Sequence, residues 1–256
     1  AYFRDQLRYY CAWKPHTIWL DDDVRVESHG KNPNGCYCKR CVAAFAEAEG
    51  RAWTRETLVA AAKTDKALAA RWRAHCFRGL AEFAYAFCKA VKEFSPETRL
   101  GFQYPWADEG QLAIVEAMAK AAGGKIAMRP GSCHYNDWNP YGLVDKTYRM
   151  QEQMKTLSAR FGLFDRLCPE IETYPRNFTM RTARSLGFEA LMHLAAGMDS
   201  LTWYVAGNAE PCEWYERTVF KAPRANMWLY REYVARNRGA DPVGFAAFPH
   251  EIGPWT

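Results

Sequence analysis

The sequence lacks the long apolar run and the dense basic segment that mark membrane proteins and nucleic-acid-binding proteins. No stretch approaches the roughly 18 uninterrupted apolar residues of a membrane-spanning helix, and the N-terminal segment is too polar for the core of a signal peptide. The 34 Lys and Arg against 29 Asp and Glu give a formal net charge of +5, but the basic residues are scattered. We therefore expect neither a membrane nor a nucleic acid as a partner.

A disulfide framework and a nucleotide-binding loop are also missing. The nine cysteines are an odd number, and six of them stand alone inside apolar segments, which is typical of a reducing compartment. We therefore expect a cytoplasmic protein. No glycine-rich phosphate loop follows the first apolar run, so we expect no organic cofactor.

What the chain does contain is a globular composition, with 49% hydrophobic and 25% charged residues. Short apolar runs alternate with longer segments whose apolar residues recur at helical spacing. The runs predict five strands, over residues 16–20, 99–104, 125–129, 167–172 and 200–205. The longer segments predict helices over residues 3–13, 72–94, 108–122, 141–161, 178–196 and 214–237. No linker or repeat separates them, so we expect one catalytic domain over residues 1–256.

Strands that alternate with helices form either an open doubly wound sheet or a closed barrel of parallel strands. Polar and aromatic residues follow the ends of the predicted strands, and a barrel gathers the carboxyl ends of its strands around one mouth. We therefore predict an α/β fold of the (βα)8 TIM-barrel type. Because five strands cannot close a barrel of eight, we expect this chain to hold the last five or so βα units and to lack about three N-terminal ones.

Two acidic clusters carry the main indication of function. Glu170 and Glu172 lie two positions apart in the fourth predicted strand, so both carboxylates project from one face. Asp21, Asp22 and Asp23 follow the first predicted strand. Glycoside hydrolysis needs two carboxyl groups at one site, since one protonates the leaving oxygen while the other attacks or activates water.

Each cluster also has a plainer interpretation. Glu170 and Glu172 could be buried ion-pair partners of Arg129 or Arg25. The three aspartates could cap a helix or loop, or could offer hard oxygen ligands to Ca²⁺ or Mg²⁺. These interpretations lead to two alternative functions: a non-catalytic carbohydrate-binding barrel, and a metal-dependent hydrolase that uses the aspartates as ligands.

Three cysteines stand close together at Cys36, Cys38 and Cys41. Three thiols within six residues, in a chain without a disulfide framework, favour a tetrahedral zinc site over free thiols or a local disulfide. The fourth ligand stays open between His29, Cys11 and a residue upstream of this sequence. Thiolates that fill the coordination shell would make the metal structural and not catalytic.

The first predicted strand and the cysteine segment resemble glycoside hydrolase family 42, the β-galactosidases. The resemblance is carried by Trp19-Leu-Asp-Asp-Asp23, by Cys36-Tyr-Cys38-Lys-Arg-Cys41-Val-Ala-Ala-Phe45 and by Glu172-Thr-Tyr-Pro175. In that family an Asn-Glu pair on strand four supplies the acid/base. A Cys-x-Cys-x-x-Cys segment binds zinc with a cysteine from earlier in the chain, and the nucleophilic Glu of strand seven precedes a Pro by three positions.

The resemblance implies a retaining glycosidase that cleaves a β-galactoside or a related small β-glycoside. Glu172 would be the nucleophile and Asp23 the acid/base, with their carboxyl groups ~5 Å apart. This chain departs from the family at Asp22 and Asp23, which stand where the family has Asn and Glu. Asp21 and Asp22 would raise the proton affinity of Asp23 by like-charge repulsion, and Glu170 would orient the other groups.

Polar and aromatic residues after the strand ends are expected to contact the sugar. They are Gln103, Tyr104, Trp106, Arg129, His134, Tyr135, Asn136 and Trp203. The surplus of aromatic residues, at 15% of the chain, suits a sugar-binding cleft, although a core role is the alternative for Trp203. The expected partner is a carbohydrate substrate, and the resemblance also implies a homo-oligomer.

Overall fold

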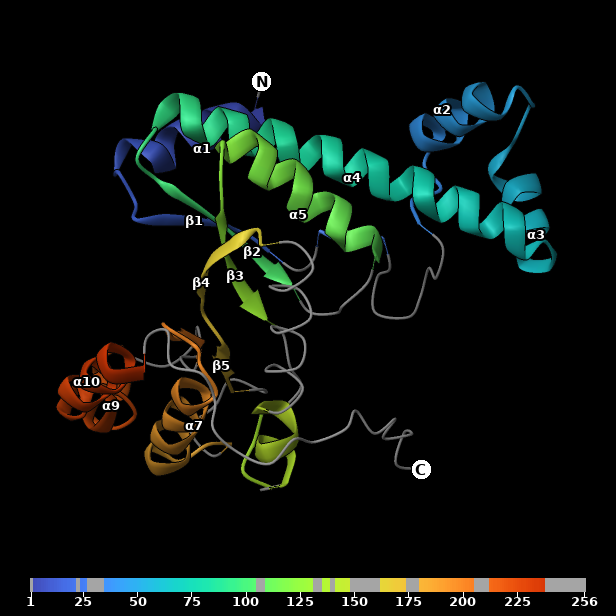
Figure 1. Cartoon of the computed structure of the whole chain (residues 1–256). Coiled ribbons are helices and arrows are strands. Elements are labelled where there is room, and N and C mark those ends of the chain that lie inside the picture. Colours follow the sequence, from blue (N-terminus) through green and yellow to red (C-terminus); the bar gives the residue numbers. More distant parts are fainter. Residues whose placement is uncertain are drawn as a thin grey trace.

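Parallel strands flanked by helices make up the fold (Figure 1). The computed structural model describes residues 2–21, 24–26, 35–104, 109–130, 135–138, 141–147, 162–173, 180–204 and 212–237. The strands are β1 (Thr17–Leu20), β2 (Arg99–Tyr104), β3 (Ile126–Pro130), β4 (Phe164–Leu167), β5 (Glu170–Glu172) and β6 (Thr202–Tyr204). The helices are α1 (Tyr2–Ala12), α2 (Lys39–Glu49), α3 (Arg55–Thr64), α4 (Lys66–Phe94), α5 (Glu109–Ala122), α7 (Ala183–Ala195), α8 (Cys212–Arg217), α9 (Lys221–Ala225) and α10 (Met227–Asn237), and residues 141–147 are also helical.

The strand pairings between the described residues are parallel and follow chain order. β1, β2, β3 and β4 form one sheet in that order, and β5 pairs with β6 in a second. The chain crosses between the two sheets at Cys168 and Pro169. The Cys168 N–H donates to the Met128 carbonyl (2.8 Å), and the Pro169 carbonyl accepts from the Thr202 N–H (3.2 Å). The predicted α/β class with parallel strands is confirmed.

The single strand predicted over residues 167–172 is wrong, because two short strands occupy this region. β4 begins earlier than predicted, at Phe164, and β5 begins at Glu170. Pro169, between them, has no N–H to donate to a neighbouring strand, so a continuous ladder cannot form through it. The other four predicted strands agree with the observed ones to within two residues at each end.

The longest helix, α4, packs with α5 on the four-stranded sheet (Figure 1). Its start is capped by the Asp65 carboxylate, which accepts a hydrogen bond from the Leu68 N–H (2.9 Å). Its end, at Phe94, precedes Pro96, as predicted, because the residue before a proline is disfavoured in a helix. The helix predicted over residues 72–94 is confirmed, and it begins six residues earlier than predicted, at Lys66.

Three apolar cores support the elements that carry the candidate sites. The main core lies between α1, α4, α5 and the four-stranded sheet. A second core joins β5 to α7 and α10 through Ile171, Leu186 and Tyr230. A third holds α2 and α3 against the first half of α4, around Phe45 and Trp72. The third core anchors the segment that contains the three close cysteines.

Two of the predicted helices differ from the structure. The helix predicted over residues 178–196 begins only at Ala183, since the Thr182 hydroxyl caps it by accepting the Ser185 N–H (3.1 Å). The helix predicted over residues 214–237 is three helices, α8, α9 and α10; Pro223 cannot donate within a longer helix and lies in the first turn of α9. Among the described residues, no helix is both long and apolar enough to cross a membrane.

Candidate functional site

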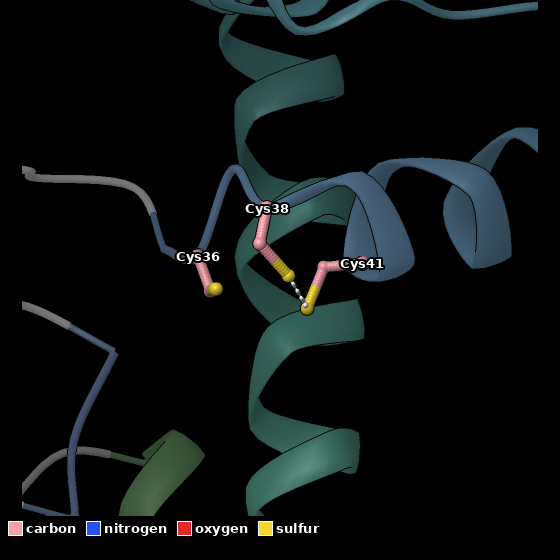
Figure 2. Close-up of side chains that lie close together, drawn as sticks. All are labelled: Cys36, Cys38 and Cys41. Atoms are coloured by element: carbon pink, nitrogen blue, oxygen red, sulfur yellow. Dashed lines mark hydrogen bonds between the residues drawn. The ribbon is translucent and has the colours of Figure 1, made fainter.

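The three clustered cysteines come together in the structure as the sequence predicts. The sulfur atoms of Cys36, Cys38 and Cys41 lie within 4.8 Å of one another (Figure 2). Cys38 is the N-cap residue of α2 and Cys41 lies in its first turn, which brings their Sγ atoms to 3.5 Å. The start of α2 therefore sets the relative positions of two of the three thiols.

The spacing of the three thiols suits metal binding, and the pKa values of Cys38 and Cys41 are shifted in opposite directions. A hydrogen bond from the Cys41 N–H, together with contacts to the Cys41 and Cys36 side chains, lowers the pKa of the Cys38 thiol to about 7. Burial, with contributions from the same neighbours, raises the pKa of Cys41 to about 12. Tetrahedral sulfur ligands at about 2.3 Å from zinc lie about 3.8 Å apart, which is close to the observed spacing. The three cysteines could therefore hold a metal ion.

Of the candidates for a fourth ligand, the structure separates Cys11 from the cluster. Cys11 lines a cavity at the amino end of the sheet together with Phe94 and Ser95, at the end of α4. The cysteine cluster lies against α4 near Cys76, 18 residues before Phe94, and this corresponds to about 27 Å along the helix. Cys11 is therefore not a ligand of this cluster, and His29 lies outside the described residues.

A second group of predicted residues meets where β2 and β3 end and β5 begins. Glu170 and Glu172 are buried, with exposed fractions of 6% and 8%, and they flank Ile171, which packs on α7. The Glu170 carboxylate forms an ion pair with Arg129, and Arg129 also donates to the Gln103 side chain. The ion-pair interpretation thus applies to Glu170. The contacts of Arg129 with Glu170 and Gln103 therefore connect β2, β3 and β5 in the region where a site was predicted.

The remaining predicted residues fall into three groups. Asp22, Asp23, Trp106 and His134 lie outside the described residues. Asp21 follows β1 and is exposed, Tyr104 ends β2, and Tyr135 and Asn136 are half-buried in the loop that follows β3. Trp203, on β6, is half-buried and its ring makes an edge contact with Phe220 (6.5 Å between centroids) in the core beside α7.

Directly beside β5 lies a buried charge cluster that was not predicted. Glu189 on α7 accepts from Lys146 (2.7 Å), from Arg181 (2.6 Å) and from His193 (3.2 Å), and all four side chains are at most 1% exposed. Two of these cations also hold the strand, since Lys146 donates to the Glu170 carbonyl (2.7 Å) and Arg181 to the Glu172 carbonyl (3.4 Å). The cluster therefore fixes the backbone that carries both glutamates.

The charges within this cluster are strongly coupled. Burial alone would raise the pKa of Glu189, but Lys146, His193 and Arg181 outweigh it, so its pKa is well below the ordinary range. Burial lowers the pKa of His193, opposed by its hydrogen bond to the Glu189 carboxylate, and burial likewise lowers the pKa of Lys146. Glu189 is thus an anion that compensates buried cations.

The sequence holds one signal of this cluster. Glu189 and His193 are four residues apart within the apolar segment predicted as a helix over residues 178–196, so they share one helix face. Arg181 falls within the same predicted segment but lies two residues before the observed start of α7, whereas Lys146 comes from a different segment and nothing in the spacing connects it with Glu189. The pair was therefore detectable from the sequence, but the cluster was not.

Comparison with known proteins returned no match, whether to a family model, to a curated protein or to a solved structure. The chemistry available to this chain is accordingly judged from its own side chains. These are three thiols that could hold a metal, and two buried glutamates on a strand whose backbone is held by cations.

Proposed function

We propose that this protein is a retaining glycoside hydrolase that cleaves a β-galactoside or a related small β-glycoside. The observation that carries the proposal is Glu172, a carboxyl group 8% exposed at the end of β5. A buried carboxylate is costly unless its environment or its role compensates it. The resemblance to glycoside hydrolase family 42, stated above from the sequence, assigns the nucleophile to the same residue.

The proposal includes a (βα)8 barrel as the finer description of the fold. Parallel strands that follow one another in chain order support it, because a doubly wound sheet reverses its strand order at a switch point. In a barrel of parallel strands, the carboxyl ends of all strands, those of β1 and β5 included, surround one mouth. The aspartates after β1 and the glutamates of β5 would then face a common opening.

Each acidic residue has a distinct role in the proposed mechanism. Glu172 attacks the anomeric carbon while Asp23 protonates the departing oxygen, and Asp23 then activates the water that releases the sugar. Glu170 is held by Arg129 and positions the site, so it neither attacks nor transfers a proton. Asp21 and Asp22 favour the protonated form of Asp23 by like-charge repulsion.

The metal held by the cysteines is proposed to be zinc, in a structural role. Cysteine thiolates are soft ligands that suit Zn²⁺, and a shell filled by thiolates leaves no open position for a substrate. Zinc would fix the conformation of the loop after β1, which is the loop that begins with Asp21, Asp22 and Asp23. Its removal is expected to affect stability more than the chemical step.

A panel of nitrophenyl glycosides tests the proposal. We expect release of nitrophenol from a β-galactoside or a closely related β-glycoside, with the β-configured sugar formed first, as retention requires. Binding of the glycosides without turnover would instead favour a carbohydrate-binding barrel. Activity lost to a chelator and restored by Mg²⁺, Mn²⁺ or Ca²⁺ would favour a metal-dependent hydrolase.

Substitution of Asp23 by alanine tests the assignment of the acid. Good leaving groups need little protonation, so Asp23→Ala should retain most of its kcat/KM for a dinitrophenyl glycoside while losing about 10²- to 10⁴-fold in kcat/KM for an alkyl glycoside. The ratio of kcat/KM for the two substrates, in wild type and variant, is the measurement. Equal losses on both substrates would contradict the assignment.

A further inference from the structure

We infer that Cys76 of α4 is the fourth ligand of the metal held by Cys36, Cys38 and Cys41. The resulting site has four cysteines and ties the loop after β1 to the longest helix of the fold. This inference rests on the metal site proposed above and is independent of the hydrolase activity. It also departs from the family resemblance, in which the fourth cysteine comes from earlier in the chain.

Direct contact between the loop and the Cys76 thiol is the main argument. The Cys36 backbone N–H donates a hydrogen bond to the Cys76 sulfur. A Cβ added at Gly35 would lie 2.5 Å from that sulfur, and Gly35 has φ +122°, where only glycine is unstrained. The backbone at positions 35 and 36 therefore lies directly on the Cys76 side chain.

The thiols approach one space from two sides. Cys36 and Cys41 line a cavity together with Cys76 and its neighbours on α4. Figure 2 shows the sulfurs of Cys38 and Cys41 turned toward each other, with Cys36 on the same side and α4 passing behind the three side chains. A tetrahedral ion held by these three thiols takes a fourth ligand, and α4 supplies a cysteine that lines the same cavity.

The local charge suits four thiolates. Four cysteine thiolates around Zn²⁺ leave a net charge of about −2. Arg25 lines the same cavity, and Lys39 and Arg40 begin α2 between Cys38 and Cys41. The N-terminus of α2 adds its own positive partial charge at Cys38. These groups compensate the negative charge that a fourth thiolate would add.

His75 is the competing ligand, because it neighbours Cys76 on α4 and lines the same cavity. Its ring is stacked on Trp72 (5.7 Å between centroids) and makes an edge contact with Phe45 (5.3 Å) in the third core. Those packing contacts orient the imidazole, whereas the Cys76 sulfur already contacts the backbone of a ligand residue. The structure therefore favours Cys76 over His75.

Zinc affinity of single variants tests the inference. The full chain, purified with a thiol reductant, is titrated with zinc against a chromophoric chelator, for the wild type and for Cys76→Ser, Cys38→Ser, His75→Ala and Cys88→Ser. Cys88 is the matched control, since it lies on α4, is fully buried and is not among the described residues that line the cavity shared by Cys36, Cys41 and Cys76. Cys76→Ser and Cys38→Ser should each weaken zinc binding by more than the roughly 10- to 100-fold that loss of a supporting residue costs. Cys88→Ser and His75→Ala should bind zinc as the wild type does.

Cobalt substitution gives a second measurement that does not depend on stability. Thiolate-to-cobalt absorption should decrease in Cys76→Ser and keep its wild-type strength in Cys88→Ser. Melting of the metal-free variants separates a folding defect from a lost ligand, because a lost ligand removes the zinc-induced rise in Tm without lowering the metal-free Tm.

Three results would overturn the inference. In the first, Cys76→Ser binds zinc like the wild type while Cys38→Ser does not, so the site exists without Cys76. In the second, His75→Ala loses zinc and Cys76→Ser keeps it. In the third, the wild-type chain binds no zinc at all, and the metal site then fails while the glycosidase proposal remains to be judged on its own panel of substrates.

Discussion

Replacing Glu172 with glutamine is expected to lower kcat for an activated aryl glycoside by on the order of 10³-fold or more. Glutamine has nearly the same shape but is not a nucleophile, so no covalent glycosyl intermediate can form. Folding should be retained, because the replacement is isosteric at a position only 8% exposed. Turnover of the nitrophenyl substrate found in the panel, together with the Tm, is the measurement.

A matched control and a rescue experiment sharpen this result. Glu116→Gln on α5 changes an exposed glutamate and should leave turnover and Tm unchanged. In Glu172→Ala, added azide should occupy the vacated space, attack the anomeric carbon and displace the nitrophenolate, so that a β-substrate yields an α-glycosyl azide. Wild-type turnover in Glu172→Gln would remove this residue from the mechanism, and a variant without azide product would reduce it to a positioning role.

Replacing Glu189 with glutamine should destabilise the fold by about 3–5 kcal/mol. The carboxylate is the common partner of Lys146, Arg181 and His193, all with side chains at most 1% exposed. Its removal takes the paired carboxylate from Lys146 and leaves Arg181 with Asp137 (2.8 Å) as its ion-pair partner, which is more costly than loss of a pair at the surface because Lys146 is buried. Chemical denaturation of both proteins measures the difference in the free energy of unfolding.

The exposed pair Glu213 and Arg217 on α8 provides the control. Its side chains are 77% and 76% exposed, so Glu213→Gln should leave the unfolding midpoint nearly unchanged. If Glu189→Gln changed stability no more than Glu213→Gln does, the buried cluster would contribute nothing to stability and its proposed role in holding β5 would be wrong.

The effect of Glu189→Gln should also depend on pH in a defined direction. The pKa of Glu189 is depressed in the folded state, so its stabilising contribution is fully present above the unfolded value of about 4.3. That contribution is lost as the pH falls below this value toward the folded pKa. The difference in unfolding free energy between wild type and variant should therefore be largest near neutral pH and should narrow under acid conditions. A difference that stays constant from neutral pH to pH 3 would contradict the assigned charge.

The fold was predictable where short-range rules apply. The run at residues 99–104 coincides with β2, and Ser95 and Pro96 correctly mark the end of α4. Prediction failed where apolar spacing indicated one continuous element but the folded chain divides it. Apolar spacing continues from residue 214 to 237, yet the chain breaks into three short helices there.

The candidate sites divide in the same way. Cys36, Cys38 and Cys41 were found because six consecutive residues contain all three thiols, and the first turn of α2 is enough to bring two of them together. The pairing of Glu170 with Arg129 was only one of several interpretations in the sequence. It became definite because β3 and β5 place the two side chains next to each other.

By itself the sequence indicated the alternation of strands with helices and located the cysteine segment, because these features depend on residues near one another in the chain. Only the tertiary structure decided that Cys76 lies under Gly35 and that Lys146 and Arg181 converge on Glu189. Gly35 and Cys76 are 41 residues apart and Lys146 and Glu189 are 43 apart, whereas Arg181 and Glu189 are only eight apart, and packing of the cores brings all of them together. The spacing of residues along the chain does not predict which distant side chains will contact one another in the folded protein.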